Sequence, residues 1–517
     1  MIRQDTLYAR FAESARRHPD AAALELDGAR HTYAELDALA GHIAAALVAS
    51  TGGAGPRRVG LLALRTLTAY AGYLAVQRLG ATVVPLHPGF PPPRTAATAK
   101  AAALDRVLAD PEHAGTPLPV PVLAPDVTTA AANPAPHPEA EARAAGPDDV
   151  CYILFTSGST GTPKGVPIRH RNVTAYLDHV TARYGIGVGD RLSQTFDLTF
   201  DLSVFDLFAA WSRGATVVVP GRGDLLAPAR FVARERITHW FSVPSVISLA
   251  RRLRGLAPGS MPTLRWSLFC GEPLTAAQAE AWQAAAPDSV LENLYGPTEL
   301  TLSCTQYRLT GTPAEPVSGN GTVPIGQLHP GLEQLVVDDE GRPADEGELC
   351  VRGVQRFPGY LDPADNAGRF LRYEPGDGRA AAVDAPEAPD DRLWYRTGDR
   401  VRLGEEGLTH LGRLDHQVKV RGYRLELGEV ESELRAHPSV RDAVALTLPG
   451  PGGETRLAAA CTGDDVDPAD VLAELRARLP EYMVPDTLTV LADLPLNTNG
   501  KIDRRALRDT LTTARAR

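Results

Sequence analysis

The feature that most constrains the fold is an apolar segment that runs directly into a loop of small polar residues. Residues 152–165 read YILFTSGSTGTPKG, with one lysine, Lys164, near the end. The glycines let the backbone turn tightly and approach an anion, while the hydroxyls and the lysine supply donors and a positive charge. The glycines are Gly158, Gly161 and Gly165, and the hydroxyls belong to Thr156, Ser157, Ser159, Thr160 and Thr162. These residues predict a strand followed by a phosphate-binding loop.

Two other interpretations of this loop are weaker. The P-loop pattern needs a Gly-Lys pair followed by Ser or Thr, whereas Pro163 precedes the lysine here and Gly165 follows it. A plain Gly/Ser linker would not follow a strand of buried-type residues, and it would rarely end in Pro-Lys-Gly. The loop is therefore better explained as an anion cradle of another kind.

Composition limits the class of protein. A chain of 517 residues is too long for one core, and a net charge of −10 offers no basic surface for nucleic acid. The sequence contains no apolar run of membrane-spanning length, and its start lacks the apolar core of a signal peptide. The five cysteines lack any Cys-x-x-Cys spacing, so we expect buried free thiols in a reducing cytoplasm. They are Cys151, Cys270, Cys304, Cys350 and Cys461.

The N-terminal part of the chain alternates between strand and helix patterns. Val59–Leu64 and Ala81–Leu86 are typical of buried strands joined by a helix, which indicates a parallel α/β sheet. Thr32 and Glu35 have the spacing of a capping box at the start of an amphipathic helix. The apolar face of that helix contains Leu36, Leu39, Ile43 and Leu47.

We expect an α/β fold in two parts. A large N-terminal region of mixed and parallel sheets flanked by helices covers residues 1–414, and a small mobile α+β domain covers residues 415–517. Residues 109–147 and 371–391, which are rich in Pro, Ala, Gly and Asp, are expected to form surface loops. Helices of the small domain are predicted near residues 428–436 and 467–479.

Five further segments carry polar residues on turns, and each alone could be an ordinary surface turn. They are 293–299 (NLYGPTE), 394–399 (WYRTGD), 412–424 (GRLDHQVKVRGYR), 479–485 (LPEYMVP) and 495–503 (PLNTNGKID). Together, in this order, they resemble the adenylate-forming (ANL) superfamily, specifically the amino-acid adenylation enzymes of nonribosomal peptide synthesis. The resemblance extends from about residue 10 to about residue 510.

The resemblance implies ATP and Mg²⁺ as cofactors and assigns a nucleotide site. The ATP-binding residues would be Thr156, Ser157, Gly158, Ser159, Thr160, Gly161, Lys164, Asn293, Tyr295, Gly296, Asp399 and Arg413. Within that set the loop would hold the β- and γ-phosphates, Tyr295 would stack near the adenine, and Asp399 would accept the ribose hydroxyls. Arg413 would help to bind the ribose.

The catalytic residues implied by the resemblance are Lys501, Thr298 and Glu299. Thr298 would contact the α-phosphate, and Glu299 would hold the metal, since Mg²⁺ prefers carboxylate oxygens. Lys501 would reach the carboxylate and the α-phosphate during adenylation. Asp415 would be the hinge about which the small domain turns for thioester formation. Residues 421–424 (RGYR) would then face the pantetheine channel.

The segment Phe200–Asp206 (FDLSVFD) addresses the substrate. In the family its first aspartate, here Asp201, pairs with the α-ammonium of an amino acid; the alternative is a helix N-cap. The remaining pocket residues would be Leu202, Phe205, Phe241, Leu268, Cys270, Leu294, Leu302 and Ser303. These walls are mostly apolar and bulky, and they offer no countercharge, so we expect a small neutral amino acid.

The resemblance is closest to the D-alanine–carrier-protein ligases, and alanine is therefore the leading substrate. The shared segments are residues 200–206, 242–245 (SVPS), 268–272 (LFCGE) and 295–299. Leu294 and Leu302 are bulkier than that subfamily suggests, which leaves the amino acid and its enantiomer open. An acyl- or aryl-CoA synthetase, a β-amino-acid ligase and a homologue that only binds nucleotide are the alternatives.

The chain ends suggest a free-standing monomeric ligase. No condensation-type region precedes the adenylation motifs, and Ser439 is the last serine, so no phosphopantetheine attachment site follows Lys501. The expected partner is a discrete acyl or peptidyl carrier protein with phosphopantetheine, and neither nucleic acid nor a membrane is expected.

Overall fold

The computed structural model divides the chain into two compact units. It describes all residues except 1–4, 128–143, 159–162, 222, 310–320, 416, 451–453, 496–501 and 516–517, and the side chains of 513–515. The larger unit contains residues 1–88, 98–155 and 165–414, and the smaller contains 89–97, 156–164 and 415–517. The last boundary falls between Leu414 and Asp415, the position of the expected hinge. Movement about that position stays a prediction.

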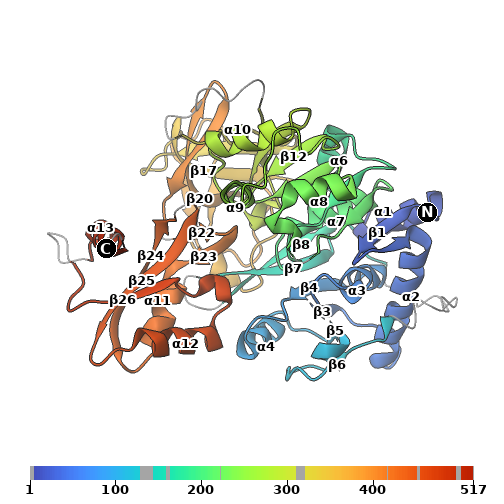
Figure 1. The fold of residues 1–517 in the computed structure, drawn as a ribbon, viewed down its shortest axis with the longest axis horizontal. Helices are drawn as coiled ribbons and strands as arrows, with labels where there is room; N and C mark the ends of the chain where they lie inside the picture. Colours follow the sequence, from blue (N-terminus) through green and yellow to red (C-terminus); the bar gives the residue numbers. More distant parts are fainter. Residues whose placement is uncertain are drawn as a thin grey trace. The chain divides into compact units, whose positions relative to one another are not determined.

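The first sheet of the larger unit has six strands. Their order is β6 (Val122–Leu123), β5 (Arg106–Ala109), β3 (Arg58–Leu62), β4 (Thr82–Leu86), β7 (Val150–Thr156) and β8 (Lys164–Arg169). The predicted strand–helix–strand unit is confirmed, because β3 and β4 are parallel and α3 (Leu67–Arg78) connects them. Helices α2 (Tyr33–Ser50) and α3 lie side by side next to these strands (Figure 1). The chain also forms α4 (Pro92–Ala101) and a 3₁₀ turn, η1 (Pro111–His113).

The second sheet of the larger unit has nine strands. Their order is β15 (Gln327–Leu328), β14 (Thr305–Arg308), β13 (Val290–Tyr295), β12 (Trp266–Phe269), β11 (His239–Ser242), β9 (Arg191–Ser193), β10 (Thr216–Val218), β1 (Ala22–Leu26) and β2 (Ala29–Thr32). The associated helices are α1 (Leu7–Arg17), α6 (His170–Tyr184), α7 (Ser203–Trp211), α8 (Pro228–Glu235), α9 (Ser245–Arg252) and α10 (Ala276–Ala285), with 3₁₀ turns η2 (Asp224–Leu226) and η3 (Thr298–Leu300). The inner strands run parallel from β10 to β13, so their carboxyl ends share one edge.

A third, antiparallel sheet completes the larger unit. It contains β16 (Leu332–Val337), β17 (Glu346–Gly353), β20 (Trp394–Gly404), β18 (Phe370–Arg372), β19 (Ala381–Val383) and β21 (Gly407–Arg413), near the 3₁₀ turn η4 (Pro363–Asn366). The expectation of a loop over residues 371–391 is wrong in part, because β18 and β19 form a hairpin. Buried Phe370 and Leu371 anchor that hairpin on β20. The loop expected over residues 109–147 likewise contains the two-residue strand β6, parallel to β5.

The smaller unit has an α+β core of its own. Its strands are β22 (Gln417–Val420), β23 (Tyr423–Glu426), β24 (Val440–Pro449), β25 (Thr455–Gly463) and β26 (Thr487–Val490), and its helices are α11 (Leu427–Arg435), α12 (Pro468–Arg478), η5 (Glu481–Met483) and α13 (Arg504–Arg515). The two predicted helices, α11 and α12, pack beside β24–β26 (Figure 1). Leu434, Leu475 and Ala459 meet in this core and are almost fully buried.

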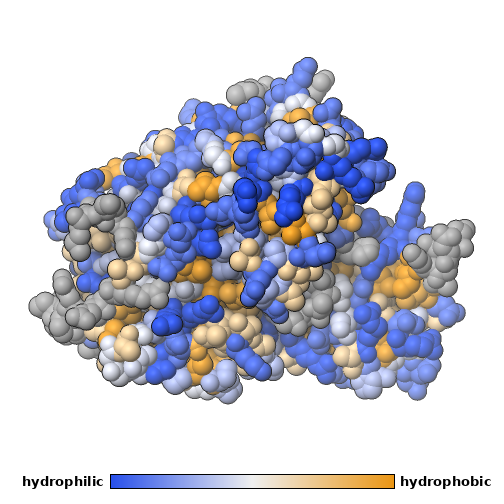
Figure 2. All heavy atoms as spheres, turned by 180° about the vertical axis from the view of Figure 1, so that it is seen from behind, coloured by the Kyte–Doolittle hydropathy of each residue, from blue (hydrophilic) through white to orange (hydrophobic). Residues whose placement is uncertain are grey.

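The predicted burial of the cysteine thiols is confirmed. The face seen in Figure 2 is covered mainly by hydrophilic side chains, with small hydrophobic groups between them. All five cysteines are buried, and none of them forms a disulfide. Among the described residues no helix is both long and apolar enough to cross a membrane.

The predicted capping box at the start of α2 is present, and we expect it to stabilise the protein measurably. Thr32 Oγ1 accepts the Glu35 N–H at 3.2 Å, and Glu35 Oε2 accepts the Thr32 N–H at 2.8 Å. Thr32→Ala should lower the free energy of unfolding by about 1 kcal/mol, because an orphan donor loses its partner. Urea titration would measure it. Thr116→Ala, which removes a single turn hydrogen bond, serves as control and should stay within about 0.5 kcal/mol.

Candidate nucleotide and amino-acid site

Strand β13 delivers the candidate site through a tight turn at its carboxyl end. A Cβ atom at Gly296 would lie 2.6 Å from Ser303 Cα and 2.9 Å from the Leu302 carbonyl oxygen, so only glycine fits. The Cys304 N–H donates to the Tyr295 carbonyl at 2.7 Å and closes the turn. This closure brings the predicted residues of segment 293–303 to one edge of the nine-stranded sheet.

A buried carboxylate lies at the centre of the predicted ribose site. Tyr295 Oη donates to Asp399 Oδ2 at 2.7 Å, and an Arg413 guanidinium nitrogen lies 3.0 Å from the same oxygen. Gly398 (φ +72°) turns the backbone just before the carboxylate. The structure therefore brings Tyr295, Asp399 and Arg413 together, as the resemblance implied; their contact with ATP stays a prediction.

Sequence reasoning missed one member of this cluster, His410. Its Nε2 lies 2.9 Å from Asp399 Oδ1, whereas the hydrogen bonds from Tyr295 and Arg413 go to Oδ2. No motif marks the residue. The only signal is the antiparallel pairing of β20 with β21, which aligns Asp399 with Arg413 and places His410 nearby.

These neighbours determine the charge of Asp399. Burial opposes its ionisation, but the hydrogen bond from His410 and the charge of Arg413 outweigh burial and hold the pKa of the carboxyl well below its usual range. Burial and the Asp399 charge together raise the pKa of Tyr295 far above its usual value, so its hydroxyl remains a donor. Asp399 is thus an ionised acceptor, which suits hydroxyl groups of a ligand.

Glu299 provides the second buried carboxylate. Its side chain is fully buried, and Oε1 accepts a hydrogen bond from Tyr360 Oη at 2.6 Å. Tyr395 Oη lies 3.3 Å from the same tyrosine hydroxyl. Among the described residues no cluster of three or more His, Cys, Asp or Glu could hold a metal alone. A single carboxylate fits Mg²⁺, which usually takes one or two carboxylates plus phosphate oxygens. Thr298, half-buried, precedes Glu299 at the start of η3.

Asn293 has a structural contact as well as its predicted place near ATP. Its Nδ2 donates to the carbonyls of Val323 and Pro324 at 3.2 and 2.9 Å, which fastens that segment along β13. Its Oδ1 is buried and accepts no hydrogen bond from the residues that the structure describes.

The predicted phosphate loop is described only at its two ends. Ser159, Thr160 and Gly161 lie outside the described residues, and so does Lys501. Thr156 ends β7, with Ser157 and Gly158 following it, and Lys164 begins β8. Within the smaller unit, Ser157 Oγ donates to the Arg424 carbonyl at 3.0 Å and accepts the Glu426 N–H at 3.1 Å. Asp415 Oδ1 accepts the Gln417 N–H at 3.2 Å.

Asp201 is nearly buried, with 8% of its surface exposed, just before helix α7. Helix α7 begins at Ser203, and Leu202 before it already has right-handed helical backbone angles, so the alternative of Asp201 as a helix cap stays open. Burial of a carboxylate in this position requires a partner, since an isolated charge is costly to desolvate.

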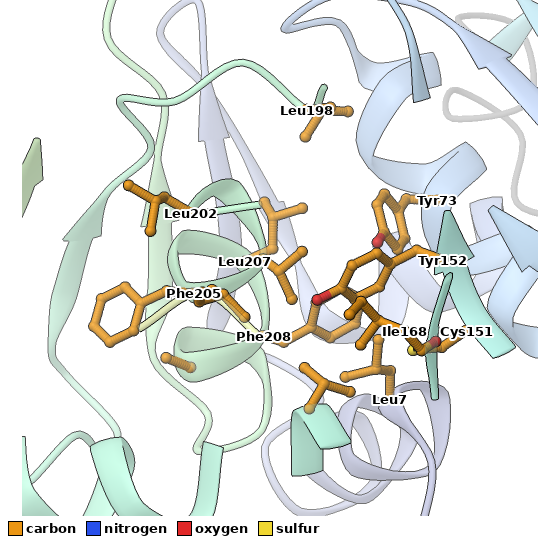
Figure 3. Close-up of a cluster of buried hydrophobic side chains, with 14 of the residues drawn as sticks. Leu7, Tyr73, Cys151, Tyr152, Ile168, Leu198, Leu202, Phe205, Leu207 and Phe208 are labelled. Atoms are coloured by element: carbon orange, nitrogen blue, oxygen red, sulfur yellow. The ribbon is translucent and has the colours of Figure 1, made fainter. Parts of the chain in front are cut away.

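Most of the predicted pocket residues share one face of the nine-stranded sheet. Phe241 pairs with Leu268, and Phe269 pairs with Asn293, so strand alternation places Cys270 beside Leu294 on the face that also carries Phe241. Helix α7 covers this face, with the Phe205 ring 5.0 Å from the Phe241 ring. Figure 3 shows Leu202 and Phe205 with the neighbouring hydrophobic cluster, where Phe208 approaches Tyr73. Leu302 and Ser303 follow the Gly296 turn and are fully buried.

Comparison with known proteins identifies the family. Residues 11–361 match the AMP-binding enzyme family, and residues 429–501 match the AMP-binding enzyme C-terminal domain. The chain belongs to the AMP-binding enzyme family. The L-proline--[L-prolyl-carrier protein] ligase of Pseudomonas fluorescens is 37% identical to this AMP-binding enzyme over 371 residues, 70% of this chain and 68% of that one. Phosphinothricin tripeptide synthetase PhsC of Streptomyces viridochromogenes is 36% identical over 98% of this chain, which spans 45% of that synthetase.

Solved structures agree with this family and with the predicted fold. The crystal structure of IdnL7 is 40% identical, with a TM-score of 0.70 and 99% of each chain covered. The adenylation domain AlmE of Vibrio cholerae, in complex with glycyl-adenosine-5'-phosphate, is 28% identical, with a TM-score of 0.81 and 99% of each chain covered. The predicted α/β fold with a smaller C-terminal domain is thereby confirmed, and the chain is an adenylation enzyme of the nonribosomal peptide synthetase type.

The Asp399 cluster leads to a prediction on pH. A carboxyl whose pKa is depressed in the folded state adds stability above its ordinary pKa, near 4, and loses it progressively as the pH falls towards the native value. Asp399→Asn should lower the free energy of unfolding by roughly 3 kcal/mol. That loss should be present at pH 5 and shrink below about pH 4.

Urea titrations at several pH values would measure this difference. Asp384→Asn, at an exposed position, is the matched control and should show a small difference that does not vary with pH. A difference for Asp399→Asn that stayed constant down to pH 3 would contradict the assignment of a depressed pKa.

Proposed function

We propose that this enzyme activates a small neutral amino acid with ATP and transfers it to the phosphopantetheine thiol of a carrier protein. The proposal rests on two carboxylates, Asp399 and Glu299. Both are buried, and both belong to the site formed at the tight turn after β13. The Asp399 carboxylate suits ribose hydroxyls, and the Glu299 carboxylate suits a metal ion bound to phosphate. The apolar face of the nine-stranded sheet carries Phe241, Cys270 and Leu294. Asp201 lies just before helix α7, which covers that face.

The reaction proposed needs no nucleophilic side chain. A carboxylate oxygen of the amino acid attacks the α-phosphorus of ATP, the bond to the bridging oxygen breaks, and pyrophosphate leaves. The thiol sulfur then attacks the carbonyl carbon of the aminoacyl adenylate, loses its proton and expels AMP. The catalytic task is to hold anions together and in line.

Each proposed residue contributes position or charge. Tyr295, His410 and Arg413 fix the Asp399 carboxylate, which would orient the ribose. Thr298 and Lys501 would donate to the α-phosphate oxygens, and Lys164 would add positive charge at the β- and γ-phosphates. Mg²⁺ held by Glu299 would neutralise phosphate charge when bound.

The apolar face beside β13 supports a small neutral substrate. The Phe205 and Phe241 rings pack edge to face, and Leu294 lies on the same face of the sheet as Phe241. Asp201 would receive the ammonium group, and alanine is the first candidate for the side chain. Relatives support the partner, because an artificially fused adenylation–PCP protein from Klebsiella oxytoca is 26% identical with a TM-score of 0.80.

Substrate choice is tested by amino-acid-dependent ATP–pyrophosphate exchange over L-, D- and β-amino acids, benzoate and acetate. We expect the fastest exchange with alanine or a close neighbour such as glycine, serine or 2-aminobutyrate. Asp201→Ala should reduce kcat/KM by about 10²–10³, because the ammonium loses its buried partner. Exchange restricted to a carboxylate without an amine would contradict the proposal and favour an acyl- or aryl-CoA synthetase.

The role of Lys501 is tested by separating the two half-reactions. Lys501→Ala should slow pyrophosphate exchange by about 10²–10³, since one donor to the developing charge is lost. Thioester formation from synthetic aminoacyl adenylate should be much less affected. Lys100→Ala, at an exposed position on α4, is the matched control. Exchange by Lys501→Ala at the wild-type rate would contradict the assigned role.

A further inference from the structure

The turn that follows η3 contains an unusual backbone conformation. Thr301 and Leu302 are consecutive residues with φ values of +58° and +69°, in the left-handed region. A β-branched residue and a bulky one rarely adopt this region, because the side chain collides with its own backbone. Such a conformation persists only where the surrounding structure holds it.

Gln355 is the side chain that holds this turn. It is 1% exposed, and the two N–H groups of its Nε2 are shared among three carbonyls in the turn. The acceptors are the carbonyls of Leu300 at 3.1 Å, Thr301 at 3.3 Å and Ser303 at 2.8 Å. In return Thr301 Oγ1 donates to the Gln355 carbonyl at 2.6 Å. One glutamine amide thus lies within hydrogen-bond distance of three of the four carbonyls of residues 300–303.

The other end of the same amide is also fixed. His329 Nδ1 lies 3.2 Å from Gln355 Oε1, which accepts the hydrogen bond because Nε2 is used as a donor. Burial lowers the pKa of His329 to about 3, so this ring is neutral and Nδ1 carries its proton. The orientation of the glutamine amide is therefore determined at both ends.

The backbone that carries Gln355 is itself anchored. Asn172 Nδ2 donates to the carbonyls on both sides of the glutamine, Val354 at 2.7 Å and Arg356 at 3.1 Å. The Phe357 N–H donates to the Glu299 carbonyl at 2.8 Å, immediately before the turn. The glutamine therefore acts from a fixed support rather than from a freely moving loop.

We propose that Gln355 is a positioning residue that determines amino-acid affinity and selectivity by holding Thr301–Ser303 in the left-handed turn. It does not touch the substrate. It fixes the backbone from which Leu302 and Ser303 project, and the proposed function makes these two residues part of the amino-acid pocket. The inference rests on that proposed function. Without the glutamine, three buried carbonyls lose their donor, and the turn relaxes towards ordinary backbone angles.

A purely structural role would have a different kinetic signature. A less stable enzyme has a smaller active fraction, which lowers the apparent kcat but leaves KM and the ratio between competing amino acids unchanged. A displaced pocket wall changes KM for the amino acid and the selectivity, whereas KM for ATP changes little.

The test is Gln355→Met, which keeps the length of the side chain and removes its donor. With the full chain well below its melting temperature, pyrophosphate exchange should show KM for the best amino acid raised at least ten-fold. The ratio of kcat/KM between that amino acid and its next larger neighbour should fall at least five-fold, with KM for ATP within three-fold. Gln77→Met, which removes a buried glutamine that donates to Cys151 on the first sheet, is the control and should leave KM and the ratio unchanged.

A second variant addresses the case in which Gln355→Met does not fold. Thr301→Val keeps the shape of the side chain and removes only its hydrogen bond to the Gln355 carbonyl, so KM for the amino acid should rise about three-fold. Unchanged KM and selectivity in a folded Gln355→Met, or in Thr301→Val if that is the folded variant, would overturn the inference alone. A wild-type enzyme without amino-acid-dependent exchange would overturn the proposed function, and the inference with it.

Discussion

The close approach of the chain to itself after β13 is the constraint on which the candidate site depends. Gly296 permits an approach that any Cβ atom would block, and the Cys304 N–H closes the turn onto Tyr295. Everything that the proposed chemistry needs from this segment lies within eight residues of that glycine. A wider turn would separate Glu299 from Tyr295, and with it the metal position from the ribose position. Local backbone geometry, rather than any single charged residue, therefore sets the spacing of the site.

Much of the fold was predictable because it follows local rules. The capping box at Thr32, the buried strands β3 and β4 and the helices α11 and α12 each have a short-range signature in the sequence. The hairpin of β18 and β19 has none, since three-residue strands in a Gly- and Asp-rich stretch are stabilised by pairing with β20 rather than by their own pattern.

The residues of the candidate site also differ in whether the sequence predicts them. Tyr295, Asp399 and Arg413 occur in long motifs, so a resemblance can find them, and the structure shows that they meet. His410 and Gln355 do not. They act through hydrogen bonds that exist only once β20 pairs with β21 and once the segment after β17 reaches the turn at Thr301. Side chains whose partners are distant in the sequence produce no periodic pattern by which they could be predicted.

Consecutive residues of β13 point to opposite faces of the nine-stranded sheet. Leu294 faces the apolar side with Cys270 and Phe241, whereas Tyr295 reaches Asp399. One strand thus borders both the apolar side of the site and the Asp399 side. A substitution and a change of strand length affect these two sides differently. A substitution at Leu294 can reshape the apolar side while the partner of Asp399 stays in place. An insertion or deletion of one residue within β13 would exchange the two faces and destroy both sides at once. New substrate preferences in such a chain can therefore arise by substitution, while the length of this strand is fixed.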